Sequence, residues 1–84
     1  MTRSAEELAL AALRDAVRVV LGPDVPVTRE TRFAEDLGAD SLARVEIAEV
    51  LELGGWHLAD EDLDGLVAVG QTVDYLVARG TVLE

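Results

Sequence analysis

The chain has 84 residues and a formal net charge of −10, and half of its residues are hydrophobic although it holds one Phe, one Trp and one Tyr. A chain this short and this acidic allows one domain with an aliphatic core, and it will bind neither nucleic-acid phosphates nor an anionic membrane surface. The lack of cysteine excludes disulfide bonds and thiolate metal sites, and no apolar run approaches the length of a membrane span. We therefore expect a cytoplasmic, monomeric protein with a single domain over residues 1–84.

The first helix is predicted over residues 4–21. In "SAEE", Glu7 follows Ser4 by three residues, which is the spacing of a capping box at a helix start. Apolar residues then recur at helical spacing along one face: Leu10, Leu13, Val17, Val20 and Leu21. The "GPD" that follows ends the helix, because Gly accepts a left-handed cap and Pro cannot continue a helix.

A long connection is predicted from Pro23 to Ala39. Loops of this length are uncommon in compact domains and are often functional. We expect Phe33 and Leu37 to fix the loop to the core, and a plain spacer is the alternative.

The second helix is predicted over residues 41–53. Asp40 is a good N-cap residue, because its carboxylate can accept hydrogen bonds from the free N–H groups of the first turn. Gly54 and Gly55 end the helix, and we expect them to make that end loose.

A short helical turn is predicted at residues 60–64, and a last helix at residues 70–78. The apolar positions of the last helix are Val73, Leu76 and Val77. The chain has no strand alternation of useful length. The predicted fold class is therefore all-α, a small bundle of three main helices plus one short helix.

The second helix carries two different faces when it is projected at 100° per residue. The face expected to point to the core holds Ala43, Ile47, Val50 and Leu51. The opposite face holds Leu42, Val45, Glu46, Glu49, Glu52 and Leu53. Apolar residues rimmed by one sign of charge are typical of a partner-docking surface, and an ordinary solvated face is the alternative.

The charge of the chain is concentrated around this helix. Ten acidic residues and one basic residue, Arg44, lie between Glu35 and Asp64, so this segment carries −9 of the net charge of −10. Such a segment attracts basic protein surfaces, although solubility alone also accounts for it.

Ser41 lies at the mouth of the second helix, where the simplest interpretation is a capping residue. A hydrolase is excluded, because the only histidine, His57, lies beyond the far end of a helix about 18 Å long, whereas a Ser–His pair needs about 3 Å. A metal site is excluded because one histidine gives no ligand set and the "DEDLD" acids lack the spacing of a calcium loop. We therefore expect no catalytic residue and no metal.

The stretch "LGADSL", from Leu37 to Leu42, resembles the modification motif of acyl carrier proteins. "VEIAEVLE" is similar to the family's Val-Glu-Leu run, and "ADEDLDGLVAVGQTVDYL" is similar to its Pro-Asp-Glu-Asp, Thr-Val and Asp-Tyr-Ile stretches. The resemblance covers most of the chain. It implies that Ser41 carries 4′-phosphopantetheine, derived from coenzyme A, through a phosphodiester. The positive end of the following helix would favour that phosphate.

The resemblance implies a free-standing, non-catalytic carrier that holds an acyl or aminoacyl group as a thioester. The expected partners are a phosphopantetheinyl transferase and an acyltransferase, a ketosynthase, or an acyl or aminoacyl ligase with a basic docking surface. The following helix is the family's recognition helix. The expected docking residues are Asp40, Leu42, Arg44, Val45, Glu46, Glu49 and Glu52.

Two residues depart from the family pattern beside the motif. Ala43 stands where many members carry an acid, and Arg44 adds a positive charge. We interpret Arg44 as a contact to an acidic group on a partner or on the cargo, with relief of charge repulsion as the alternative. The departure favours polyketide or other specialised biosynthesis over fatty acid synthesis. An acidic interaction domain without a prosthetic group is the alternative from another class.

Two further positions bear on the fold. Ala68 stands where a Thr often caps the last helix, and losing a cap typically costs about 1 kcal/mol. Trp56 stands in the connector after the second helix, where a core or lid role is favoured over a contact to cargo.

Overall fold

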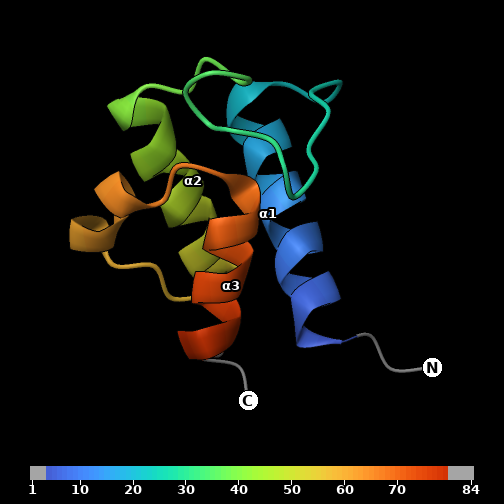
Figure 1. Cartoon of the computed structure of the whole chain (residues 1–84), viewed down its shortest axis with the longest axis vertical. Coiled ribbons are helices and arrows are strands. Elements are labelled where there is room, and N and C mark those ends of the chain that lie inside the picture. The colour runs from blue at the N-terminus through green and yellow to red at the C-terminus, as the bar shows by residue number, and fades with distance from the viewer. Residues whose placement is uncertain (1–3, 80–84) are drawn as a thin grey trace.

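A computed structural model describes residues 4–79 of the chain. Its helical elements, coloured along the chain in Figure 1, are α1 (Ala5–Leu21), α2 (Ser41–Leu53), the short 3-10 helix η1 (Asp60–Gly65) and α3 (Val69–Arg79). Residues 4–79 contain no β-strand, and Arg32 and Ala68 form an isolated antiparallel bridge. The predicted all-α bundle is confirmed. A single carrier domain over residues 1–84 stays a prediction.

Helix α1 begins where the capping pattern places it. The Ser4 hydroxyl accepts a hydrogen bond from Glu7 N at 3.1 Å, which satisfies one of the free donors of the first turn. The helix ends at Leu21, and Gly22 follows with φ of 136°, a backbone conformation that a side chain would strain.

The buried face of α1 contains two alanines. Its fully buried residues are Ala9, Leu13, Ala16 and Val17, whereas the predicted Leu10, Val20 and Leu21 are only half-buried. Small residues allow the other helices to approach α1 closely, so the face of closest packing follows the alanines and not the largest side chains.

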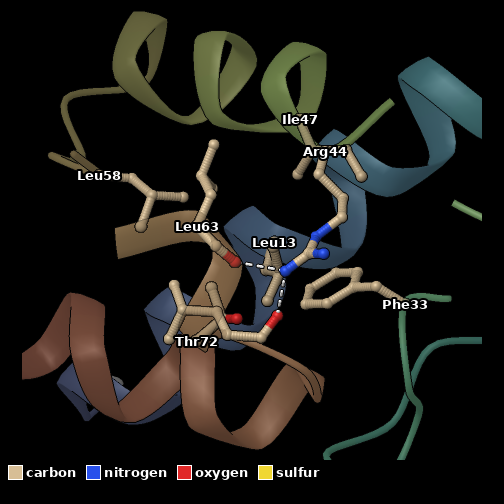
Figure 2. A pocket seen from close by; sticks show the side chains of 8 residues that line it. Leu13, Phe33, Arg44, Ile47, Leu58, Leu63 and Thr72 are labelled. Carbon is tan, nitrogen blue, oxygen red and sulfur yellow. Dashed lines mark hydrogen bonds between the residues drawn. The ribbon is translucent and has the colours of Figure 1, made fainter. Parts of the chain in front are cut away.

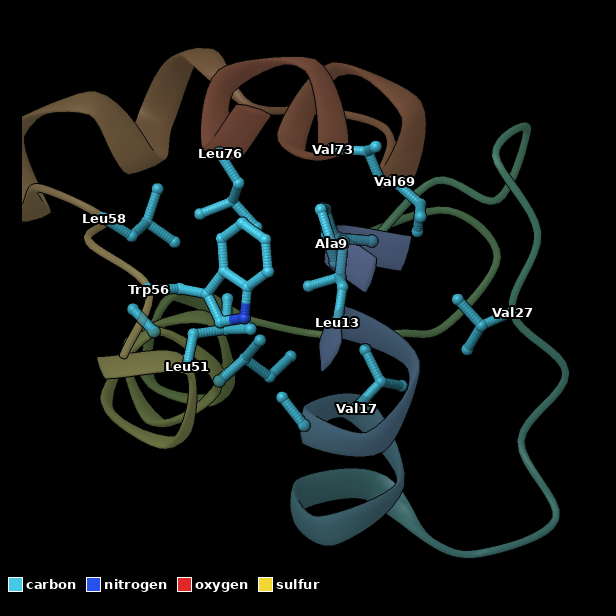
Figure 3. Packing of buried hydrophobic residues seen from close by; sticks show 14 of the residues in the cluster. Ala9, Leu13, Val17, Val27, Leu51, Trp56, Leu58, Val69, Val73 and Leu76 are labelled. Carbon is cyan, nitrogen blue, oxygen red and sulfur yellow. The ribbon is translucent and has the colours of Figure 1, made fainter. Parts of the chain in front are cut away.

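The three main helices close around one aliphatic core, in which α1 contacts both α2 and α3. The indole of Trp56 lies in this core among Leu51, Leu76 and Leu13, as Figure 3 shows. The Trp56 side chain is only 8% exposed. Its burial supports the core role over a contact to cargo.

The long connection between α1 and α2 is a structural part of the fold and not a spacer. Val27, Phe33 and Ala39 are buried, and Leu37 packs against the core. The loop arches from the end of α1 to the start of α2, and it pairs with the segment that leads into α3 (Figure 1). Phe33 N donates to Val67 O at 3.0 Å, and Val69 N donates to Thr31 O at 2.8 Å. The expected anchoring by Phe33 and Leu37 is confirmed.

Arg29 ties this loop to two helices. Its guanidinium contacts Glu6 at 2.8 Å and Asp74 at 3.1 Å. The hydrogen bond that Arg29 donates to Asp74 is the main reason that the pKa of Arg29 lies above its ordinary value. All three side chains are partly or largely exposed, so solvent screens both ion pairs and each stabilises the fold only weakly.

Helix α3 buries Val69, Thr72, Val73 and Leu76, whereas Val77, a predicted apolar position, is 38% exposed. Ala68 supplies no cap, as the sequence predicts. The long loop satisfies the first donors of the helix instead, because Val69 N and Gly70 N donate to Thr31 O and Arg29 O, both at 2.8 Å. Gln71 Oε1 reaches back to the residues before the helix and accepts from Val67 N at 2.9 Å and from Ala68 N at 3.0 Å.

The η1 segment, residues 59–66, connects α2 to α3 and is held to α3 by Tyr75. The Tyr75 hydroxyl donates to Asp62 Oδ2 at 2.5 Å and accepts from Ala59 N at 3.4 Å. Desolvation by burial, together with the hydrogen bond to Asp62, raises the pKa of the Tyr75 phenol above its ordinary value. The neutral phenol is therefore favoured by the folded state.

Replacing Tyr75 by Phe should lower the free energy of unfolding at neutral pH by about 1 kcal/mol, because the hydrogen bonds to the η1 segment are lost. The raised pKa adds a pH dependence. The stabilisation of the fold by the neutral Tyr75 phenol is complete below about pH 10, the ordinary tyrosine pKa, and it is lost as the pH rises through the raised pKa. Chemical denaturation between neutral pH and pH values above about 10 measures both effects. Wild type should lose stability more steeply than Y75F at high pH, and parallel curves would contradict this account.

Candidate functional site

Ser41 is the first residue of α2, and its side chain is exposed. The residue before it caps the helix: Asp40 Oδ1 accepts from Ala43 N at 2.9 Å, and Asp40 O accepts from Arg44 N at 3.0 Å. The predicted N-cap is therefore in place. Because Asp40 performs the capping, Ser41 Oγ is not needed for it, and it makes no hydrogen bond to another residue in the range 4–79.

The end of the long loop fixes where this serine lies. Ala39 is buried and donates from its N to Phe33 O at 2.8 Å, so the chain is anchored two residues before Ser41. Gly38 has φ of 64°, in the left-handed region, and no atom lies near the place of a Cβ. Backbone conformation, not space, is thus the reason for glycine here. The exposed serine follows a firmly anchored turn.

The exposed side of α2 carries most of the predicted docking residues. Glu46, Glu49 and Glu52 are exposed, as are Leu42 at 67% and Leu53 at 89%. Val45 is different, because it is half-buried and packs against the core. Ala48, which the projection assigned to neither face, is 2% exposed. Helix α2 packs against α1 on one side and the η1 segment on another, so its buried arc is wider than one stripe.

The far end of α2 is an ordered cap, contrary to the loose end that the two glycines suggested. Trp56 N donates to Leu51 O and Gly55 N donates to Glu52 O, both at 3.0 Å. Gly55 has φ of 94°. This is the Schellman arrangement, in which a left-handed glycine lets two N–H groups satisfy the last carbonyls of the helix. It also turns Trp56 into the core.

Arg44 lies one turn beyond Ser41, but its guanidinium is directed inward. Its Nη2 donates to Leu63 O and, at 2.7 Å, to Leu66 O, both in the η1 segment (Figure 2). None of the interpretations from sequence included this contact, and the expected contact of Arg44 to a partner or cargo stays a prediction. Those carbonyls lie far along the chain, and a backbone acceptor leaves no signal in the sequence.

Arg44 and Thr72 are the polar side chains around a small cavity between α2, η1 and α3. The cavity has a volume of about 10 Å³, and its remaining walls are Leu13, Phe33, Ile47, Leu58, Leu63 and Leu66. Thr72 is buried, and its hydroxyl donates to Ala68 O at 3.2 Å. The cavity has room for about one water molecule, so it is closed to anything larger.

Other chemistry finds no support among residues 4–79. No three His, Asp or Glu side chains of this range gather as metal ligands. His57 is exposed and follows the C-terminal end of α2, whereas Ser41 opens its N-terminal end. A helix of 13 residues separates its ends by about 20 Å, so the two side chains cannot pair. No helix within the described residues is long and apolar enough to span a bilayer.

Comparison with known proteins identifies the family. Residues 11–76 match the family described as "Phosphopantetheine attachment site". The "Meromycolate extension acyl carrier protein" of Mycolicibacterium aurum is 40% identical over 78 residues, which is 90% of this chain and 79% of the relative. An "Acyl carrier protein" of Exiguobacterium sp. is 40% identical over 76 residues, which is 88% of this chain and 96% of the relative. An "Acyl carrier protein" of Rubrobacter xylanophilus is 45% identical over 56 residues, which is 66% of this chain and 69% of the relative.

The helical fold and the family match define a non-catalytic carrier whose prosthetic group is phosphopantetheine. The match covers most of the chain, and the relatives align along most of their own length. The chain belongs to the acyl carrier proteins.

The capping role of Asp40 can be separated from its charge. Asp40→Ala should lower the free energy of unfolding by about 1 kcal/mol, whereas Asp40→Asn should lose little, because Asn also caps well. Thermal and chemical denaturation of the two variants beside wild type measures the difference. Equal losses in both variants would mean that the charge, and not the hydrogen bond to Ala43 N, is what stabilises this helix start.

Proposed function

We propose that Ser41 is the residue that carries the phosphopantetheine arm. The observation that carries the proposal is the exposed hydroxyl at the first position of α2, left without a partner within residues 4–79 because Asp40 performs the capping. The surroundings fit a phosphodiester. No acidic side chain occupies the first turn of α2, and the free N–H groups of a helix start favour a phosphate.

The attachment is a displacement at phosphorus. Ser41 Oγ bonds to the phosphorus of the phosphopantetheinyl group of coenzyme A, the bond from that phosphorus to the adenosine bisphosphate half breaks, and the hydroxyl proton passes to a base of the transferase. When bound, the arm supplies a thiol that holds the cargo as a thioester. The chain's own contribution is to present the hydroxyl on a fixed turn, with Ala39 buried behind it.

We further propose that the cargo is a growing acyl chain in polyketide or other specialised biosynthesis. Two relatives, from Mycolicibacterium aurum and Mycolicibacterium smegmatis, are named for meromycolate extension, and others are named simply acyl carrier protein. These names favour acyl over aminoacyl cargo. The first turn of α2 supports a specialised pathway, because Ala43 and Arg44 stand where many members of the family carry an acidic turn.

The docking surface proposed for partner enzymes consists of Asp40, Leu42, Glu46, Glu49 and Glu52. Its two leading features are the exposed Leu42 and the three glutamates beyond it, with Val45 at the edge. Arg44 leaves the expected set because its guanidinium is bound to the η1 segment. The surface is therefore acidic throughout, and it suits a transferase and an acyltransferase or ketosynthase that present a basic patch. The free-standing state, the cytoplasmic location and the monomer stay predictions.

The attachment residue is tested by mass. Ser41→Ala should abolish the mass gain on incubation with coenzyme A and a broad-specificity phosphopantetheinyl transferase, because no other hydroxyl among residues 4–79 is presented in the same way. The matched control is Ser4→Ala, at the other serine of the chain, which caps α1 and should leave the modification intact. Circular dichroism should show both variants folded. A mass gain in Ser41→Ala would overturn the assignment.

The docking surface is tested by charge reversal. Glu46→Lys or Glu49→Lys should slow transfer by a cognate partner and weaken its dependence on salt, because exposed charges act mainly on the association rate. Stopped-flow or single-turnover assays at low and moderate ionic strength give the measurement. Glu30→Lys makes the same charge change at an exposed site in the long loop and should leave transfer unchanged. Wild-type rates in both α2 variants at all salt concentrations would mean that the face is only solvated.

A further inference from the structure

The interior cavity is too small for an acyl chain unless one wall moves. At about 10 Å³ it has room for roughly one water molecule. Leu13, Ile47 and Thr72 line it from α1, α2 and α3, and Phe33 lines it from the long loop, where Phe33 N is bonded to Val67 O; α1 packs against both α2 and α3. The remaining side is the connector between α2 and α3 that contains the η1 segment, from which Leu58, Leu63 and Leu66 line the cavity. Opening the cavity therefore means moving this segment.

Arg44 opposes that movement. Its Nη2 bridges two carbonyls at the end of the η1 segment, Leu63 O and Leu66 O. Leu63 O also accepts from Leu66 N at 3.1 Å, whereas Leu66 O has no other donor among residues 4–79. An acyl chain that displaces the η1 segment breaks the hydrogen bonds from the Arg44 guanidinium to these carbonyls. Because these bonds are partly buried and their donor is charged, losing them without replacement costs free energy.

The chemistry of the incoming acyl chain decides whether the lost hydrogen bonds of Arg44 are replaced. A saturated chain has no atom that can accept from the guanidinium. A chain with a hydroxyl or carbonyl oxygen close to the thioester can accept an N–H in place of a backbone carbonyl. Thr72 adds a second polar group to the wall: its hydroxyl already donates to Ala68 O, so its oxygen can accept from a hydroxyl of the chain.

We propose that Arg44 determines which acyl chains the carrier shelters: it closes the cavity to saturated chains and admits chains that bear an oxygen beside the thioester. The inference rests on the proposed attachment at Ser41, which begins the arm one helical turn from Arg44. Saturated cargo then stays outside on its arm, whereas oxygenated cargo folds into the cavity with its oxygen on the guanidinium. Arg44 acts here as a specificity-determining residue of the carrier and not as a docking contact.

The hydrogen bonds of Arg44 can be tested without any cargo. In R44M, which keeps a long side chain but removes the donors, the amides of Asp62 and Leu66 should exchange with deuterium about tenfold faster than in wild type. Both amides donate within the η1 segment. The amides of Leu13 and Val17 in α1 should be unaffected. The control is R18M, the same change at an exposed site on α1, which should alter neither group. Unchanged exchange at Asp62 and Leu66 in R44M would overturn the closing role.

Selectivity is tested on the loaded carrier by chemical protection of the thioester. Wild type, R44M and R18M are loaded with octanoyl and with 3-hydroxyoctanoyl groups, and the rate of hydroxylamine cleavage is divided by that of the same acyl group on free pantetheine. In wild type and R18M, the 3-hydroxyoctanoyl thioester should be protected about tenfold more than the octanoyl thioester. In R44M the octanoyl thioester should gain protection and the preference should disappear. If R44M does not fold, R44Q, which keeps an N–H₂ group without the charge, should change in the same direction.

The outcomes separate the inference from the proposed function. Equal protection of the two groups in wild type, or a preference that survives in R44M, would overturn the selectivity. Failure of wild type to gain mass from coenzyme A would overturn the attachment at Ser41 instead, and the exchange experiment on the unmodified protein would still decide whether Arg44 closes the cavity.

Discussion

Three helices leave one side of the aliphatic core uncovered, and the closure of that side depends on the guanidinium of Arg44. The η1 segment that covers it is a single short 3-10 helix with its flanking residues. It is held by polar side chains at both ends, by Tyr75 through Asp62 and Ala59, and by Arg44 through two carbonyls. Leu58 and Leu63 of the connector are buried in the core, and hydrogen bonds from α2 and α3 hold the segment in place over it.

The helices themselves are encoded locally, which is why the sequence predicts their positions within one residue. Ser4, Asp40 and the glycines after α1 and α2 act over three to five residues, and those distances are visible in a linear pattern. The exposed Ser41 follows from the same signals, because an aspartate that caps leaves the next hydroxyl unused. Capping chemistry thus predicts the helices of the fold, whereas the attachment at Ser41 is implied by the resemblance of "LGADSL" to the family's modification motif.

What the sequence does not predict depends on contacts between distant segments. A projection of α2 alone cannot show that two elements pack against it, so it placed Val45 on the exposed face and assigned the buried Ala48 to neither face. Arg44 was read as a surface charge because its acceptors are backbone carbonyls 19 and 22 residues away. The first N–H groups of α3 donate to Arg29 O and Thr31 O of the long loop, and backbone acceptors in a distant loop leave no pattern in the sequence.

The guanidinium of Arg44 is directed inward although the segment around it is strongly negative. A cation in a segment of charge −9 would be drawn to the nearest carboxylates, and on the surface it would interrupt the acidic face. Bound to Leu63 O and Leu66 O, it leaves Asp40, Glu46 and Glu49 as an unbroken negative surface beside Ser41. One residue thereby separates two tasks of a carrier. The outer side of α2 stays uniform for basic partners, and the inner side controls the space where cargo could be sheltered.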